Sequence, residues 1–232
     1  MLQTRCSLIQ RLGAVCLVIM LLCTSIGQAQ AQITSNVFRR VLMIQTGHGT
    51  GSSFTIEVDG RQYLITAKHV VAGLKPEDTI QIRKGEEWSS VKVKVLRCDE
   101  PIDIAVLVPP VQLTVTFPLE PTTDKVLFGQ DAYFVGFPYG ISMDGKQVND
   151  SYPIAFVKKG NFSAMVPEGI ATVIFLDGHN NPGFSGGPIV YRDLNQSGPP
   201  ISYAAGVISG FKPEFIPTVV AEEVKPDQDF KP

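Results

Sequence analysis

The chain has little cysteine: three of its four cysteines precede residue 32, and only Cys98 follows. A single cysteine cannot form an internal disulfide, so the chain after residue 31 must be held together by its own apolar core. This excludes the small disulfide-rich domains of secreted animal proteins and favours a bacterial exported protein.

The first 31 residues contain no acidic residue. Arg5 and Arg11 precede an uncharged apolar run at 12–23, and Ala29 and Ala31 supply the small residues of a cleavage site. This order is typical of a secretory signal peptide, and the apolar run is shorter than the ~20 residues of a membrane span. We expect residues 1–31 to be a signal peptide, the protein to be secreted or periplasmic, and any membrane contact to be transient and confined to this segment.

The remaining residues carry no excess of positive charge: 18 Lys and Arg stand against 22 Asp and Glu, a net charge of −4. Nucleic-acid binding, which needs a basic surface, is therefore not expected. A metal site is not expected either, because His48, His69 and His179 are 21 and 110 residues apart and no cluster of cysteines or acids joins them. No cofactor is indicated.

Long amphipathic helices are also missing, and 67–74 is the one short helical candidate. Short β-rich stretches alternate with Gly, Pro and Asp turns, at 39–46, 52–58, 61–67, 79–83, 90–96 and 103–108 and, after a proline-rich linker at 109–125, at 132–137, 152–160, 171–176, 187–191 and 201–210. Asp59-Gly60 is a strong hairpin signal. Two similar halves of short strands predict an all-β pair of barrels within residues 32–220. The barrels are expected at about 36–112 and about 127–220, and a loose tail at 221–232.

No histidine follows Ser185, and this absence decides between two interpretations of Gly183-Phe184-Ser185-Gly186-Gly187. The run matches the nucleophile elbow of α/β-hydrolases, but those enzymes need a later histidine and alternating strands and helices. A subtilisin-like order would need an acid before His69, and Asp59 there is explained by its hairpin turn. The order His, Asp, Ser, which is that of the chymotrypsin class, remains.

Three residues supply that order. His69 lies where the stretch 61–67 ends, and Asp103 opens the apolar run 103–108, where a carboxylate is costly without a partner such as His69. We predict that Asp103 orients His69, and that His69 takes the proton of the nucleophile Ser185. His48 is interpreted as a loop residue without a catalytic role.

The glycines around Ser185 have a chemical purpose. An oxyanion hole needs backbone N–H groups that converge on one point, which bulky neighbours and ordinary φ values would prevent. We expect the N–H groups of Gly183 and Ser185 to form this hole.

Three motifs, LITAKHVV (64–71), DIAVL (103–107) and PGFSGGPIV (182–190), resemble those of the trypsin-like serine proteases, in the disulfide-free bacterial branch near the HtrA-type enzymes. GTGSSFTI (49–56), VGFPYG (135–140) and GVISG (206–210) follow in family order, so the resemblance covers most of the chain after residue 31. It implies two antiparallel six-stranded β-barrels, an active site in the cleft between them, and polypeptide substrates. It also implies that Ser209 and Gly210 bind the substrate backbone as an added strand.

The sequence departs from the family at three places. Phe184 stands where digestive members carry the Asp that captures a freed N-terminus, so that activation switch is not implied. His179 stands where tryptic members carry Asp; it could select an acidic P1 side chain or be a loop residue that points elsewhere. The chain ends 22 residues after Gly210, so no PDZ domain is expected, and 215–224 is left to supply the last strand and the C-terminal helix.

Two functions stay open from the sequence. The complete set of His69, Asp103 and Ser185 favours an exported serine endopeptidase that acts through an acyl-enzyme. Phe184 and the short C-terminus favour the alternative, a catalytically silent trypsin-like module that binds peptides or a protein of the cell envelope.

Overall fold

The computed structural model describes residues 33–47, 49–115, 119–196 and 201–210. By its internal contacts the chain divides into Met1–Ile33 and Thr34–Pro232, and all described residues except Ile33 belong to the second unit. The expected signal peptide, His48 and the expected tail lie outside the described residues. None of the helices in the described part, the longest of which has four residues, could cross a membrane.

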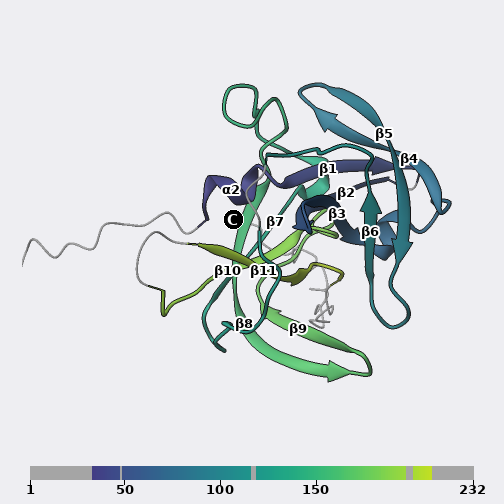
Figure 1. Cartoon of the computed structure of the whole chain (residues 1–232). Coiled ribbons are helices and arrows are strands. Elements are labelled where there is room, and N and C mark those ends of the chain that lie inside the picture. The colour runs from purple at the N-terminus through teal and green to yellow at the C-terminus, as the bar shows by residue number, and fades with distance from the viewer. Residues whose placement is uncertain (1–32, 48, 116–118, 197–200, 211–232) are drawn as a thin grey trace, which may run out of the picture. The chain divides into compact units, whose positions relative to one another are not determined.

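Six antiparallel strands form a closed barrel in the order β1-β2-β3-β6-β5-β4 (Figure 1). These strands are β1 (Val41–Thr46), β2 (Gly49–Val58), β3 (Arg61–Ala67), β4 (Glu77–Lys84), β5 (Glu87–Arg97) and β6 (Ile104–Val108). The barrel closes where Ile44 of β1 pairs with Ile82 of β4. The hairpin predicted at Asp59-Gly60 is confirmed: both residues have a positive φ, and they join β2 to β3.

The barrel interior follows from the alternation of side chains along each strand. In β4 and β5, Ile80, Ile82, Val93 and Val95 point inward and are buried, while the intervening lysines of β5 are exposed. Together with residues of the other strands they form one continuous core, whose buried members are Leu42, Ile44, Leu64, Val71, Ile80, Ile82, Val93, Val95, Ala105 and Leu107.

A second antiparallel sheet has five strands in the order β11-β10-β7-β8-β9. Its strands are β7 (Asp131–Gly136), β8 (Phe156–Glu168), β9 (Ala171–Asp177), β10 (Pro188–Arg192) and β11 (Ser202–Val207). Aromatic side chains dominate its core, with Phe162 edge-on to Tyr191 and Phe134 edge-on to Phe184. The segment expected to add a last strand, 215–224, lies outside the described residues. A closed barrel followed by a curled sheet confirms the all-β, two-barrel class.

Two predicted elements differ from the observed ones. The strand expected at 152–160 is β8, which begins at Phe156 and continues to Glu168. The predicted strand ends at Gly160, but this glycine lies inside β8, where a Cβ would stand 2.6 Å from the carbonyl oxygen of Asp177 on β9. The helical candidate at 67–74 is a single 3₁₀ turn, η1 (Lys68–Val71). Short helices α2 (Ser35–Phe38) and η2 (Pro138–Gly140) complete the described elements.

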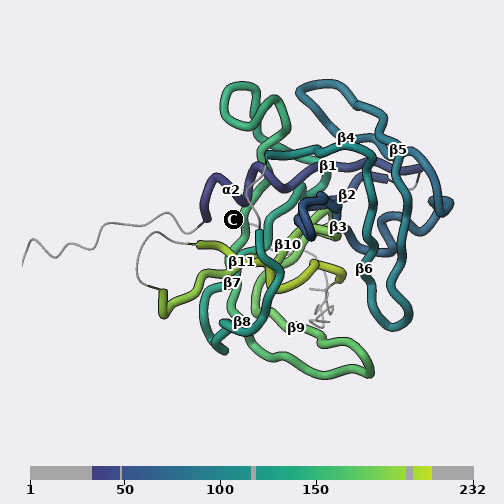
Figure 2. Tube along the Cα trace, in the orientation of Figure 1, coloured from purple at the N-terminus to yellow at the C-terminus, as the bar shows by residue number. Residues whose placement is uncertain are grey.

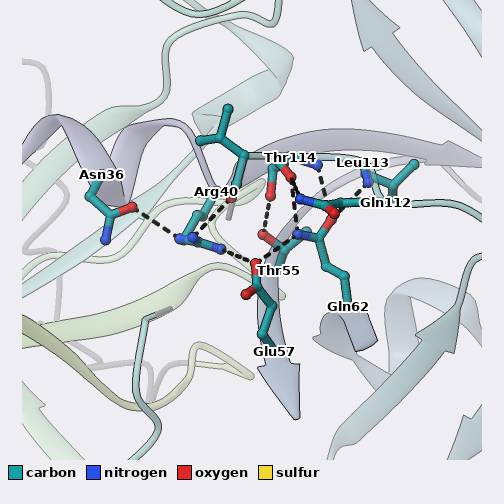
Figure 3. A network of polar contacts seen from close by, with 9 residues as sticks. Asn36, Arg40, Thr55, Glu57, Gln62, Gln112, Leu113 and Thr114 are labelled. Carbon is teal, nitrogen blue, oxygen red and sulfur yellow. Dashed lines mark hydrogen bonds and ion pairs between the residues drawn. The ribbon is translucent and has the colours of Figure 1, made fainter. Parts of the chain in front are cut away.

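A buried polar network attaches the segments that flank the first barrel (Figure 3). Arg40, which precedes β1, is fully buried, and its guanidinium donates to Asn36 Oδ1 (3.1 Å) and to the carbonyl oxygen of Val115 (3.0 Å). Glu57 on β2 lies 3.5 Å away. Burial lowers the pKa of Arg40, and Glu57 opposes this shift.

Gln62 of β3 extends the network toward the predicted linker. Its Oε1 accepts the backbone N–H groups of Leu113 (2.8 Å) and Thr114 (2.9 Å), and its Nε2 donates to the carbonyl oxygen of Thr114 (3.2 Å). One side chain therefore satisfies three backbone groups of a segment that has no strand partner. Gln62 therefore attaches the start of the predicted linker to β3, and Figure 2 shows the course of the chain after β6 up to residue 115.

Candidate active site

The pairing of β3 with β6 brings His69 and Asp103 together. Ala67 at the end of β3 pairs with Ile104 at the start of β6, so the residues just beyond these ends lie side by side. Asp103 Oδ2 lies 2.7 Å from His69 Nδ1, and its Oδ1 accepts the backbone N–H of His69 at 3.0 Å. The carboxylate holds both the ring and the backbone, and His69 Nε2 makes no hydrogen bond to the described residues.

The turn before Asp103 is attached to the first residue of η1. Lys68 Nζ donates to Glu100 Oε1 (2.6 Å) and to the carbonyl oxygen of Cys98 (3.3 Å), and the Lys68 N–H donates to the carbonyl oxygen of Asp103 (3.2 Å). The His69 side chain is half exposed, at 49 %, and that of Asp103 is 29 % exposed. The pair is accessible from solvent on one side and supported by the barrel on the other.

Ser185 lies in a tight loop whose shape depends on glycine. Gly183 has φ +100° and Gly186 has φ +87°, which L-residues with side chains rarely adopt. A Cβ at Gly183 would stand 2.3 Å from the Phe137 carbonyl oxygen, and one at Gly186 would stand 2.0 Å from the Ser52 carbonyl oxygen. The loop passes so close to both barrels that neither position has room for a side chain.

The backbone N–H groups of Gly183 and Ser185 donate to no acceptor among the described residues, whereas those of Phe184, Gly186 and Gly187 all do. Two unsatisfied donors within one tight turn, next to an accessible serine, can bind a developing negative charge. The sequence predicts an oxyanion hole at these two residues, and this role stays a prediction.

Ser52 of β2 is a positioning residue that the sequence did not single out. Its side chain is fully buried, and its Oγ donates to the carbonyl oxygen of Gly183 (2.6 Å) and accepts the N–H of Phe137 (2.9 Å). Its N–H donates to the carbonyl oxygen of Ser185 (2.9 Å). The first barrel therefore holds the serine loop of the second through one residue. Only its place in the motif GTGSS could have drawn attention to it.

Phe184 secures the same loop by burial. It is fully buried, its ring packs edge-on to Phe134 at 5.2 Å, and a Cβ at Gly136 would stand 2.9 Å from it. An apolar anchor here stabilises the loop through removal of its ring from water.

The three predicted substrate-binding residues lie in two segments that meet. His179 follows β9 and is exposed, and its Nε2 lies 3.2 Å from Asn181 Nδ2, so the ring faces its own loop. Ser209 and Gly210 follow β11 and are exposed. Asn180 Nδ2 donates to the carbonyl oxygen of Gly210 at 3.4 Å, which places the two segments side by side.

His69 and Asp103 are in contact, whereas Ser185 is not hydrogen-bonded to His69. Among the described residues, no hydrogen bond within 3.5 Å joins Ser185 Oγ to His69, although Ser185 and Val70 both lie against Gly51. Catalytic hydrogen bonds are often long before substrate binds. No group of three His, Cys, Asp or Glu side chains that could hold a metal ion occurs in the described part of the chain.

Comparison with known proteins gives a family and a fold. A family model described as a trypsin-like peptidase domain matches residues 49–196. The crystal structure of the inactive form of the Rv3671c protease, from M. tuberculosis H37Rv, is similar with a TM-score of 0.53 at 21% identity, over 76% of this chain and 80% of that one. No curated protein matches the chain.

Two further solved structures are similar at lower TM-scores. Deg5 is 22% identical, with a TM-score of 0.47 over 69% of this chain and 83% of that one. The HtrA-type protease AlgW with a tripeptide is 24% identical, with a TM-score of 0.48 over 68% of this chain and 48% of that one.

Proposed function

The chain belongs to the trypsin-like peptidase family, and from this premise we propose that it is an exported serine endopeptidase that hydrolyses peptide bonds through an acyl-enzyme. The observation that carries the proposal is the 2.7 Å contact between His69 Nδ1 and Asp103 Oδ2. It fixes the imidazole with its Nδ1–H toward the carboxylate, and a lone pair on Nε2 is then available to take a proton.

The proposed mechanism assigns one step to each group. His69 Nε2 accepts the proton of Ser185 as its Oγ attacks the carbonyl carbon of the substrate, and the Asp103 carboxylate stabilises the imidazolium. The N–H groups of Gly183 and Ser185 bind the oxyanion. The imidazolium then protonates the leaving amine, and a water molecule repeats the sequence to release the acyl group from Ser185.

Polypeptides are the proposed substrates, bound as an extra strand. Ser209 and Gly210 follow β11, an edge strand among the described residues, so their backbone groups can pair with an extended peptide. His179 is proposed to contribute to the P1 site through the loop that meets Gly210. The uncharged run at 12–23 and the absence of acids before residue 32 support export.

Two observations favour the alternative of a catalytically silent binding module. Asn180 Nδ2 occupies the carbonyl oxygen of Gly210, and Ser185 has no hydrogen bond to His69 in the described part of the chain. A module of this kind would bind peptides in the same place but would not cleave them.

Peptide hydrolysis by the protein from the exported fraction tests the proposal. We predict that Ser185→Ala lowers turnover of a peptide library by about six orders of magnitude, as loss of a triad nucleophile does, while Ser163→Ala on the exposed face of β8 leaves it unchanged. The intact mass should correspond to a chain that begins after residue 31. Peptide binding without cleavage in the unaltered protein, equal in Ser185→Ala, would establish the silent module instead.

A further inference from the structure

Lys158 of β8 reaches the loop that precedes Gly183. Its ammonium donates to the carbonyl oxygen of His179 at 3.0 Å and to Asn181 Oδ1, and it lies 5.4 Å from the centroid of the Phe184 ring. One side chain from the sheet therefore contacts the loop on both sides of the Gly183 amide.

The Asn181 side chain links Lys158 to η2, because it also contacts Tyr139. An ammonium has only donors, so the amide atom that faces Lys158 must be the oxygen. The amide nitrogen then faces Tyr139 Oη at 3.1 Å and His179 Nε2 at 3.2 Å. The Tyr139 N–H in turn donates to the carbonyl oxygen of Pro182, one residue before Gly183, at 2.8 Å.

The charge of Lys158 is directed at uncharged oxygens. Among the described residues no carboxylate lies within ion-pair distance of its ammonium, whereas the next residue, Lys159, pairs with Asp131 at 2.9 Å. Hydrogen bonds from a charged donor are shorter and stronger than those between neutral groups. The Lys158 ammonium therefore donates to the carbonyl oxygen of His179 and to Asn181 without competition from a carboxylate of the described residues.

We propose that Lys158 is a positioning residue: through His179, Asn181 and Phe184 it holds the segment 179–184 in the shape that aims the Gly183 N–H at the substrate oxyanion. The proposal rests on the proposed function, since it assigns Gly183 to the oxyanion hole. Lys158 touches no reacting atom; it acts through the loop.

The test compares Lys158→Met with Lys158→Arg and with Lys159→Met, a matched control one residue away on the other face of β8. One oxyanion donor contributes about 10²–10³ to turnover, so misplacing it in Lys158→Met should lower kcat about 10- to 100-fold while KM changes less than about threefold. Affinity for a peptide boronic acid, which forms the tetrahedral anion, should fall in parallel. Lys158→Arg should recover most of the loss, and Lys159→Met should behave as the unaltered protein.

Hydrogen–deuterium exchange over 179–187 supplies a readout that does not depend on activity. Faster exchange there in Lys158→Met, with the β-strands unchanged, supports the proposal. Unchanged exchange and unchanged kcat overturn it, as does a loss that Lys158→Arg leaves unrestored. If the unaltered protein does not cleave peptides, the proposed function fails, and the exchange data still decide whether Lys158 holds the loop. Should Lys158→Met not fold, Tyr139→Phe, which removes only the hydroxyl of an exposed side chain, should lower kcat about threefold or more.

Discussion

Two adjacent serines of β2 have different roles: one contacts the serine loop, and the other contacts a neighbouring strand of the first barrel. Ser52 and Ser53 are both fully buried, and each donates its hydroxyl to a backbone carbonyl. Because side chains alternate along a strand, Ser53 points to Leu42 on β1, within the barrel sheet, whereas Ser52 points to Gly183 in the other barrel. Only Ser52 can affect the serine loop directly.

We predict that Ser52→Ala lowers kcat about tenfold with KM changed less than twofold, since the hydroxyl contacts the loop that carries the two proposed oxyanion donors, and one such donor contributes about 10²–10³. Ser53→Ala should leave kcat within a factor of two. Both variants should lose about 1 kcal/mol of unfolding free energy, the usual contribution of a buried hydrogen bond. Steady-state kinetics and urea denaturation separate the two effects. Equal kinetic losses in both variants would mean that Ser52 acts through stability alone.

At the scale of elements, Arg40 joins parts of the chain that have no strand pairing with one another. Its guanidinium contacts α2 through Asn36, β2 through Glu57, and the segment after β6 through Val115 (Figure 3). A fully buried guanidinium is stable there only because its donors find oxygens. Removal of the cation leaves those oxygens without their donor.

We therefore predict that Arg40→Met lowers the free energy of unfolding by about 2–4 kcal/mol, in the range found when one member of a buried polar pair is removed. Its neighbour Arg39 is exposed, so Arg39→Met should change stability by less than about 0.5 kcal/mol. Urea denaturation followed by tryptophan fluorescence measures both. Similar losses in the two variants would show that the network does not stabilise the fold.

Elements with local signals were predictable from the sequence. The hairpin at Asp59-Gly60 and the alternating strands β4 and β5 were found as expected, because turn chemistry and period-two burial act over a few residues. The full extent of β8 was not predictable. Glycine is needed at position 160 because β9 approaches closely there, and the residues next to Gly160 in the sequence do not indicate this approach. The same holds for Arg40: nothing local distinguishes it from Arg39, and its burial depends on Val115, 75 residues away.

In the molecule as a whole, the sequence predicts some residues of the candidate site and does not predict the residues that support them. His69 and Asp103 could be selected because their motifs border strands β3 and β6, which pair. Ser52 and Lys158 could not be selected from the sequence, because the way the sheets pack decides which residues they contact. Ser52 contacts Gly183, 131 residues away, and Lys158 contacts Asn181, 23 residues away. The order of motifs along the chain was enough to predict the fold class, whereas the supporting residues could be identified only from the three-dimensional structure.

Activation of the proposed nucleophile Ser185 by His69 is tested most directly by fluorophosphonate labelling of the folded protein with mass mapping of the adduct. We expect one adduct, on the peptide that contains Ser185; it should be absent in Ser185→Ala and should form much more slowly in His69→Ala. A folded protein that forms no adduct at Ser185, or labels as fast without His69, would contradict this expectation.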